Sequence, residues 1–139
     1  MKKILLFIIT IFMVVFTCAC DNEQANILFN KHQFTQDTIL SPSNTNVFKP
    51  GERIYYLVTL PKQVESKMLL IQIVKIGGDK AEMYGYDLVW GKRVKLRDEQ
   101  AHYYTDYVVL NSTGAYTMKV YSRDNPTKIL TTANFYVKN

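Results

Sequence analysis

The sequence predicts an all-β domain, a single antiparallel sandwich of about seven to eight strands that follows a cleaved signal peptide. All ten tyrosines lie after residue 20, and aromatic side chains favour strands. Glycine and proline fall between the apolar runs, where turns are expected. The runs recur at the short, even spacing that is typical of a sandwich.

The first 19 residues are typical of an export signal. Lys2 and Lys3 give a positive start, residues 4–16 form an apolar run interrupted by Thr10, and small residues lead to Cys20. A charged start, an apolar stretch of this length and a small-residue exit together indicate a segment that is removed from the mature protein.

The cysteine at the exit makes this segment resemble the signal of bacterial lipoproteins, in which that cysteine becomes the lipidated first residue. Ala19, directly before Cys20, fits the pattern, whereas Thr17, three residues before Cys20, stands where leucine is usual. Thr17 also lies directly before Cys18, where a small glycine or alanine is expected, so Cys18 is the poorer candidate. The resemblance implies that acyl chains on Cys20 anchor the protein in a membrane on the extracytoplasmic side of the bacterial cell envelope. Plain secretion and an uncleaved anchor helix remain alternatives, although the apolar run is short against the ~20 residues of a span.

Removal of residues 1–19 leaves 120 residues, the size of one domain. Both cysteines lie in the signal or at its end, so no internal disulfide is expected. The remaining 15 basic and 12 acidic residues give a net charge of +3, which is too mild for a nucleic-acid-binding domain. We expect no nucleic-acid partner, no small-molecule cofactor and no metal.

Residues 20–35 are polar with scattered apolar side chains, and we expect a tether there, with the sandwich over 36–139. The apolar cluster at 27–29 leaves open a short helix or docking on the domain. A first short strand is expected over 38–40, and another over 53–60, with its even-numbered residues facing the core. Apart from that option, no pattern predicts a helix.

The middle of the chain predicts three further strands. Residues 67–76 are apolar on both faces, as expected of a central strand, and a hairpin turn at 77–80 leads into 81–90. A tight turn at Gly91 and Lys92 is expected before 93–96. For the strand over 102–110 we point Tyr107 and Val109 inward because Asp106 should face water, and the opposite register remains open.

Two strands close the predicted domain. Residues 115–122 place Tyr116, Met118 and Val120 on one inward face. Over 128–137 the apolar side chains Ile129, Phe135 and Val137 are in phase, which predicts that they share the core face.

Residues 112–118, Ser-Thr-Gly-Ala-Tyr-Thr-Met, are similar to the tyrosine corner of immunoglobulin-like sandwiches, with Gly114 and Tyr116 at the matching positions. The Pro-Gly-Glu at 50–52 and the Phe-Tyr-Val at 135–137 resemble macroglobulin-type bacterial extracytoplasmic sandwiches. The resemblance implies an immunoglobulin-like sandwich, an architecture that hosts many functions, and none of the matched residues is catalytic.

Two groups of side chains are candidates for binding. Tyrosines that fall out of phase with the core suit protein interfaces or sugar stacking, although tyrosine is also simply a good strand residue. Four cations between 92 and 97 share one face if Val94 and Leu96 point the other way. They either prevent edge-to-edge pairing of an exposed strand or contact an anionic surface. The candidates are Tyr55, Tyr103 and Tyr121, with Tyr136 as a further option, and Lys92, Arg93, Lys95 and Arg97, of which Arg93 and Lys95 are preferred.

We therefore expect a non-catalytic lipoprotein that binds a protein partner or scaffolds an envelope assembly. Recognition of a glycan or wall polymer is an alternative within the binding class. An alternative of another class is a small metal-dependent or hydrolytic enzyme that uses Asp98, Glu99 and His102. A polar loop between strands explains that cluster equally well.

Overall fold

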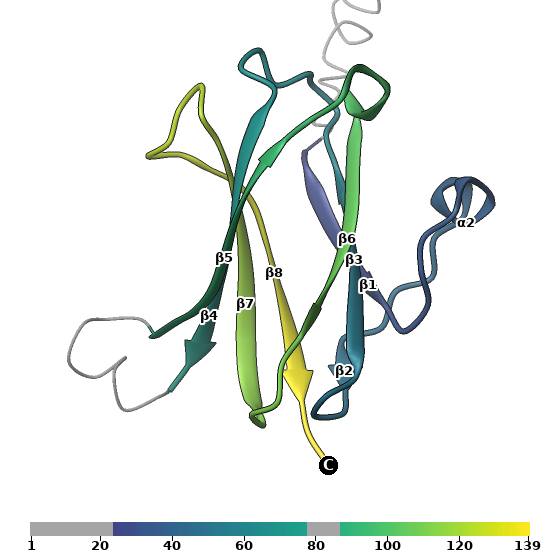
Figure 1. The fold of residues 1–139 in the computed structure, drawn as a ribbon, viewed down its shortest axis with the longest axis vertical. Coiled ribbons are helices and arrows are strands. Elements are labelled where there is room, and N and C mark those ends of the chain that lie inside the picture. The colour runs from purple at the N-terminus through teal and green to yellow at the C-terminus, as the bar shows by residue number, and fades with distance from the viewer. Residues whose placement is uncertain (1–23, 78–86) are drawn as a thin grey trace, which may run out of the picture.

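The computed structural model describes residues 24–77 and 87–139, in which eight strands form two sheets that pack as a sandwich (Figure 1). The predicted all-β sandwich is confirmed. One sheet has the order β1 (Asn26–Asn30), β3 (Arg53–Thr59), β6 (Tyr103–Val109); the other has the order β2 (Val47–Phe48), β8 (Ile129–Val137), β7 (Gly114–Ser122), β4 (Met68–Ile76), β5 (Asp87–Lys95).

Every pair of neighbouring strands is antiparallel except β2 and β8, which run parallel over two residues. The first described residues lie at one end of the sandwich and the C-terminus lies at the other (Figure 1). No helix within residues 24–77 and 87–139 has the length and apolar character needed to cross a membrane.

The core lies between the sheets and is filled by alternate residues of the long strands. The inward faces predicted for β3 and β7 are confirmed, because every second residue from Ile54 and from Tyr116 is buried. Leu57 and Val74 are also buried, on the opposite faces of their strands and outside the main core cluster.

The tyrosine corner is confirmed. The Tyr116 hydroxyl donates a hydrogen bond of 2.6 Å to the carbonyl oxygen of Ser112, and its ring stacks on Phe135 with centroids 5.5 Å apart. Gly114 has a φ of +155°, and a Cβ there would lie 2.7 Å from the side chain of Lys75. The lysine chain end could move aside, but L side chains rarely adopt this φ, so the turn favours glycine two residues before the tyrosine.

Strand β1 lies inside the range 20–35 that we expected to be a tether, so that expectation is wrong for residues 26–30. Ile27 pairs with Val58 of β3, and the ring of Phe29 lies 4.9 Å from that of Phe135. Ile27 and Phe29 are buried, because their alternation completes the inner face of the small sheet. Docking on the domain, the alternative left open for this cluster, is what the structure shows.

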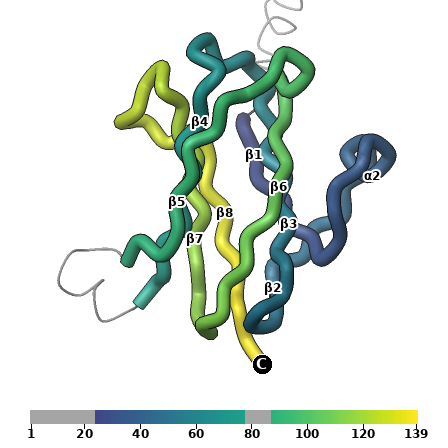
Figure 2. Tube along the Cα trace, viewed as in Figure 1, coloured from purple at the N-terminus to yellow at the C-terminus, as the bar shows by residue number. Residues whose placement is uncertain are grey.

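A short helix, α2 (Gln36–Leu40), replaces the strand expected over 38–40. Its start is fixed locally, because the amide of Thr35 donates to the hydroxyl of Thr38 and that hydroxyl donates back to the Thr35 carbonyl. The helix belongs to an excursion from the sheets (Figures 1 and 2). A hydrogen bond from Thr45 to the Phe29 carbonyl joins the two ends of the excursion.

Strand β5 runs without a break through Gly91 and Lys92, where we expected a tight turn. Gly91 pairs with Gln72 and Lys92 with Ile71, so both residues continue the ladder to β4. The hairpin turn expected at 77–80 and the strand start at 81–86 fall, apart from Gly77, outside the described residues.

The register that we preferred for β6 is wrong. Tyr107 and Val109 are 44% and 42% exposed, whereas Val108 is buried. Asp106 consequently lies on the inward side of an edge strand, where Lys92 of β5 neutralises it. An ion pair across the gap between the sheets makes this register acceptable, and sequence alternation within one strand does not reveal it.

Strand β8 contains a β-bulge that changes the phase of its first residues. Val120 pairs with Thr131 but Tyr121 pairs with Ile129, which leaves Leu130 without a partner in the ladder. Ile129 is therefore 40% exposed, contrary to our expectation. Phe135 and Val137, which follow the bulge, are buried as predicted.

Candidate binding surface

Arg93, Leu70 and Tyr121 form one row across the outer face of the large sheet. Leu70 of β4 pairs with Arg93 of β5 on one side and with Tyr121 of β7 on the other. Their neighbours along each strand, such as Val94 and Val120, are buried in the core. Because side chains alternate along a strand, the three residues of the row point outward.

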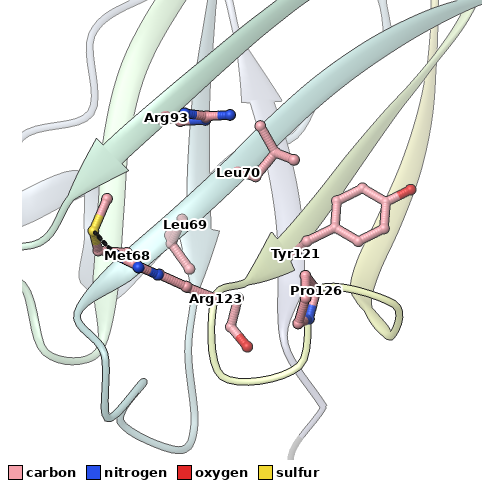
Figure 3. A pocket seen from close by; sticks show the side chains of 8 residues that line it. Met68, Leu69, Leu70, Arg93, Tyr121, Arg123 and Pro126 are labelled. Atoms are coloured by element: carbon pink, nitrogen blue, oxygen red, sulfur yellow. Dashed lines mark hydrogen bonds between the residues drawn. The ribbon is translucent and has the colours of Figure 1, made fainter.

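A groove of about 420 Å³ follows this row. Figure 3 shows Leu70 between Arg93 and Tyr121, with the guanidinium of Arg123 close to Met68. The Nη1 atom of Arg123 lies 3.8 Å from the sulfur of Met68. The groove is lined by Met68, Leu69, Leu70, Arg93, Tyr121, Ser122, Arg123 and Pro126.

The charge on this face has one sign. Its four cations are Arg93, Lys95, Lys119 and Arg123, and in the described part of the chain none of them forms an ion pair with a carboxylate. The strands β4, β5, β7 and β8 contain a single carboxylate, Asp87, which pairs in register with Lys75. Cations gathered without counter-charges attract anionic partners. We call these four cations the basic face.

The carboxylate next to the groove in sequence, Asp124, binds backbone amides. Its two oxygens accept hydrogen bonds of 2.9 and 2.8 Å from the amides of Glu65 and Ser66. The hydrogen bonds from Ser66, followed by the one from Glu65, lower the pKa of Asp124. Asp124 thus fixes the loop before β4 and leaves Arg123 without an ion pair in the described chain.

The tyrosines predicted for binding do not come together on one surface. Tyr55 and Tyr103 lie on the small sheet and pair with Tyr107 and Thr59, whereas Tyr121 lies on the large sheet. Tyr136 also belongs to the large sheet and is exposed. Of the predicted set, Arg93, Lys95 and Tyr121 therefore share a face, and Tyr55 and Tyr103 occupy the opposite one.

The small sheet carries an aromatic cluster of its own. The rings of Tyr55 and Tyr107 lie 5.6 Å apart, and the guanidinium of Arg53 lies 5.0 Å from the centre of the Tyr107 ring. A hollow of about 250 Å³ beside them is also lined by Gln33, Thr105 and Asp106. Arg53 and Tyr107 were not among the predicted binding residues, because Tyr107 was assigned to the core.

Lys92 does not belong to the basic face, which corrects the prediction that it shares a face with Arg93. It is in phase with Val94 and binds Asp106 across the gap between β5 and β6. Burial alone raises the pKa of Asp106, but the Lys92 ammonium, the Tyr107 amide and the Tyr104 hydroxyl together hold that pKa below its ordinary value. This pair links the two sheets.

The residues proposed for an enzyme alternative have separate partners. Asp98 forms an ion pair with Lys67, and the Nδ1 atom of His102 lies 3.0 Å from the carbonyl oxygen of Leu60. Residues 98–100 form a short 3₁₀ turn. In residues 24–77 and 87–139, no three His, Cys, Asp or Glu side chains are placed to hold a metal ion.

The groove floor was missed by the sequence analysis. We expected β4 to be covered on both faces because it is apolar throughout, yet Met68 and Leu70 are partly exposed. Arg123 and Pro126 lie between the strands expected over 115–122 and 128–137 and were not among the predicted binding residues. The apolar outer face of an internal strand was the available signal, and it becomes informative once the neighbouring strands are known to leave that face uncovered.

No protein-family model and no curated protein sequence matches the chain. Among solved structures, the chain is similar to the PmoD soluble domain from Methylocystis sp. ATCC 49242 (Rockwell), with 14% identity over 82% of this chain and 90% of that one and a TM-score of 0.50. It is also similar to a superoxide reductase (neelaredoxin) from Ignicoccus hospitalis, with 11% identity over 84% and 80% and a TM-score of 0.47. Similarity at this level concerns the β-sandwich fold alone.

Proposed function

We propose that the chain is a non-catalytic binding domain, anchored through Cys20 on the extracytoplasmic side of a bacterial membrane, which docks a protein partner on its basic face. The observation that carries the proposal is the unpaired charge around the groove. Arg93 and Arg123 line a partly apolar hollow, and Lys95 and Lys119 lie at neighbouring outward positions of β5 and β7. No carboxylate of the described chain forms an ion pair with any of these four cations.

The composition of the groove supports a protein partner. Arginine, tyrosine and methionine are enriched in protein interfaces, where they combine contact area with hydrogen bonding, and the groove contains all three. Cations at the rim increase the rate of encounter with an acidic partner, and they select against basic ones.

The anchor would set the orientation of the domain. Five residues lie between Cys20 and the start of β1 at Asn26, so the six Cα–Cα steps reach at most ~20 Å. The end of the sandwich that holds Leu60 and His102 would then stay close to the membrane. The strands of the large sheet run away from that end (Figure 1). The basic face would therefore lie parallel to the membrane normal, where a neighbouring protein can reach it.

Photo-crosslinking in cells tests the docking face. A photoreactive residue at position 72, at the centre of the outer face of β4, is compared with one at position 105 on the outer face of the small sheet. We expect a discrete adduct with an acidic envelope protein from position 72, absent from position 105 and reduced when Cys20→Ala removes the anchor. Equal adducts from both positions, or none from position 72, would contradict the proposal.

A charge-matched pair of variants makes the test specific. Lys95→Glu with Lys119→Glu should reduce the position-72 adduct by about tenfold, because it reverses two charges of the basic face. Lys49→Glu with Lys138→Glu changes the net charge equally but alters exposed lysines elsewhere, and it should leave the adduct unchanged.

A glycan ligand is the second candidate, favoured by the Tyr55–Tyr107 cluster and the polar hollow beside it. Aromatic rings next to hydrogen-bonding groups suit a sugar. This surface belongs to the small sheet, whereas the groove belongs to the large one. An adduct with a wall polymer from position 105, with none from position 72, would select this candidate in place of protein docking.

A further inference from the structure

We infer that the groove binds a short, extended acidic segment in which two carboxylates flank an apolar side chain. The apolar side chain occupies the hollow above Met68 and Leu70, and the carboxylates reach Arg93 and Arg123. This inference rests on the proposed protein docking and adds to it the chemical class of the docked segment.

The spacing of the two arginines determines the spacing of the carboxylates. Arg93 lies two strands away from Tyr121 in the same row. Arg123, whose amide donates to the Met68 carbonyl, lies two residues beyond Tyr121 in the direction of its strand. Two strand separations and two residues of rise place their backbones about 12 Å apart. Acidic residues four positions apart in an extended segment point to the same side and are separated by about 13 Å, and the residue midway between them also points to that side.

The guanidinium groups suit this ligand. An arginine presents parallel donors that match the two oxygens of a carboxylate, and such pairs are strong where water is partly displaced. Neither Arg93 nor Arg123 has an acidic partner in the described chain. Asp124, the carboxylate next in sequence, is held by the amides of Glu65 and Ser66.

The backbone of the segment has room beside the row. Gly91 lies on the outer side of β5, next to Gln72. Among the described residues, a Cβ built there would have one atom within 4 Å, the Ile71 carbonyl oxygen at 3.8 Å. Because Gly91 has no side chain, the backbone of β5 is uncovered at this point, and an extended chain can approach it closely.

The apolar hollow favours a protein segment over other anions. A lipid headgroup or a phosphate polymer would neutralise the arginines but would leave Met68, Leu70 and Pro126 without a partner. A leucine-sized side chain in the hollow gains about 1–2 kcal/mol from burial, or roughly tenfold or more in affinity. Discrimination between an apolar and a polar side chain therefore separates these ligands.

Fluorescence anisotropy with labelled octapeptides and the full-length chain in detergent tests the inference. The probe contains Glu-Ser-Leu-Ser-Glu in a Gly/Ser context, which places both Glu and the Leu on one face of an extended segment; one control replaces both Glu with Gln and another replaces Leu with Ser. We expect each replacement to weaken binding by about tenfold. Arg93→Gln and Arg123→Gln should each weaken probe binding by fivefold or more. Arg53→Gln, on the opposite sheet, should have no effect.

Competition separates the sources of negative charge. Polyphosphate and a short-chain phosphatidylglycerol should displace the probe weakly, because they do not fill the hollow. Binding that is insensitive to the Leu-to-Ser change, or displacement by either anion as effective as by the unlabelled probe, would overturn the inference and indicate a general anion site.

The failure of this inference can be distinguished from failure of the docking proposal. If Lys95→Glu with Lys119→Glu abolishes the cross-linked adduct while Arg93→Gln and Arg123→Gln keep it, docking stands and the acidic segment is wrong. If the probe binds as expected but position 72 yields no adduct, the groove chemistry stands and the docking proposal is wrong.

Discussion

At the scale of single residues, Tyr116 shows how one side chain holds a turn and a core together. Its hydroxyl reaches back to the Ser112 carbonyl, while its ring stacks on Phe135 between the sheets. This role was predictable because the motif is local: the glycine, the tyrosine and the carbonyl lie within five residues of one another.

Tyr116→Phe tests the hydroxyl separately from the ring. It removes the hydrogen bond to the Ser112 carbonyl, so we expect a loss of about 1 kcal/mol in the free energy of unfolding. Tyr136→Phe, the same chemical change at an exposed position, should cost almost nothing. Urea denaturation of the two variants gives the comparison; equal midpoints would show that the hydroxyl bond is not stabilising.

At the scale of elements, the sequence predicted strands whose alternation was unbroken and failed where local chemistry or pairing intervened. Strands β3 and β7 were predicted because one face of each is uniformly apolar. Strand β5 was divided because Gly91 and Lys92 resemble a turn, although pairing with β4 keeps them extended. The helix α2 is too short to show a period, and hydrogen bonds between Thr35 and Thr38 decide its start.

Strand β1 provides the element-scale prediction. Phe29→Ala removes a fully buried ring that contacts Phe135, and it should destabilise the domain by about 3–4 kcal/mol. Leu28→Ala, on the outer face of the same strand and only partly buried, should cost much less. Guanidinium denaturation monitored by circular dichroism would measure both. A Phe29→Ala variant as stable as the parent would mean that the segment is a tether after all.

At the scale of the whole molecule, the candidate site depends on pairings that no single segment encodes. The residue types of Arg93 and Tyr121 indicated binding, but their meeting across Leu70 requires the order β5, β4, β7. The split between Tyr55 and Tyr121 has the same origin, because phase within a strand does not tell to which sheet that strand belongs. Composition therefore identified candidates, and topology selected among them.

The Lys92–Asp106 pair joins the two sheets and makes stability depend on pH. Because the folded state lowers the pKa of Asp106, the pair stabilises the fold above the unfolded pKa of about 4. This contribution disappears as the pH falls through the folded pKa. Asp106→Asn should therefore cost about 1 kcal/mol at pH 7, and the difference from the parent should shrink towards pH 3.

Thermal unfolding from pH 7 to pH 3 measures this effect. Glu65→Gln removes an exposed carboxylate and provides the control for net charge. A constant difference in melting temperature between the parent and Asp106→Asn across this range would contradict the assigned role of the pair.

The excursion that contains α2 leaves the small sheet after β1 and returns beside it. Thr45 donates to the Phe29 carbonyl, and Asn44 accepts from the Phe29 amide, while Leu40 at the end of α2 is 88% exposed. A loop with adjoining ends and an exposed tip tolerates inserted sequence. A fluorescent domain or an affinity epitope could thus be placed after Leu40, which would label the protein in living cells while the anchor that we propose at Cys20, the C-terminus and the basic face stay free.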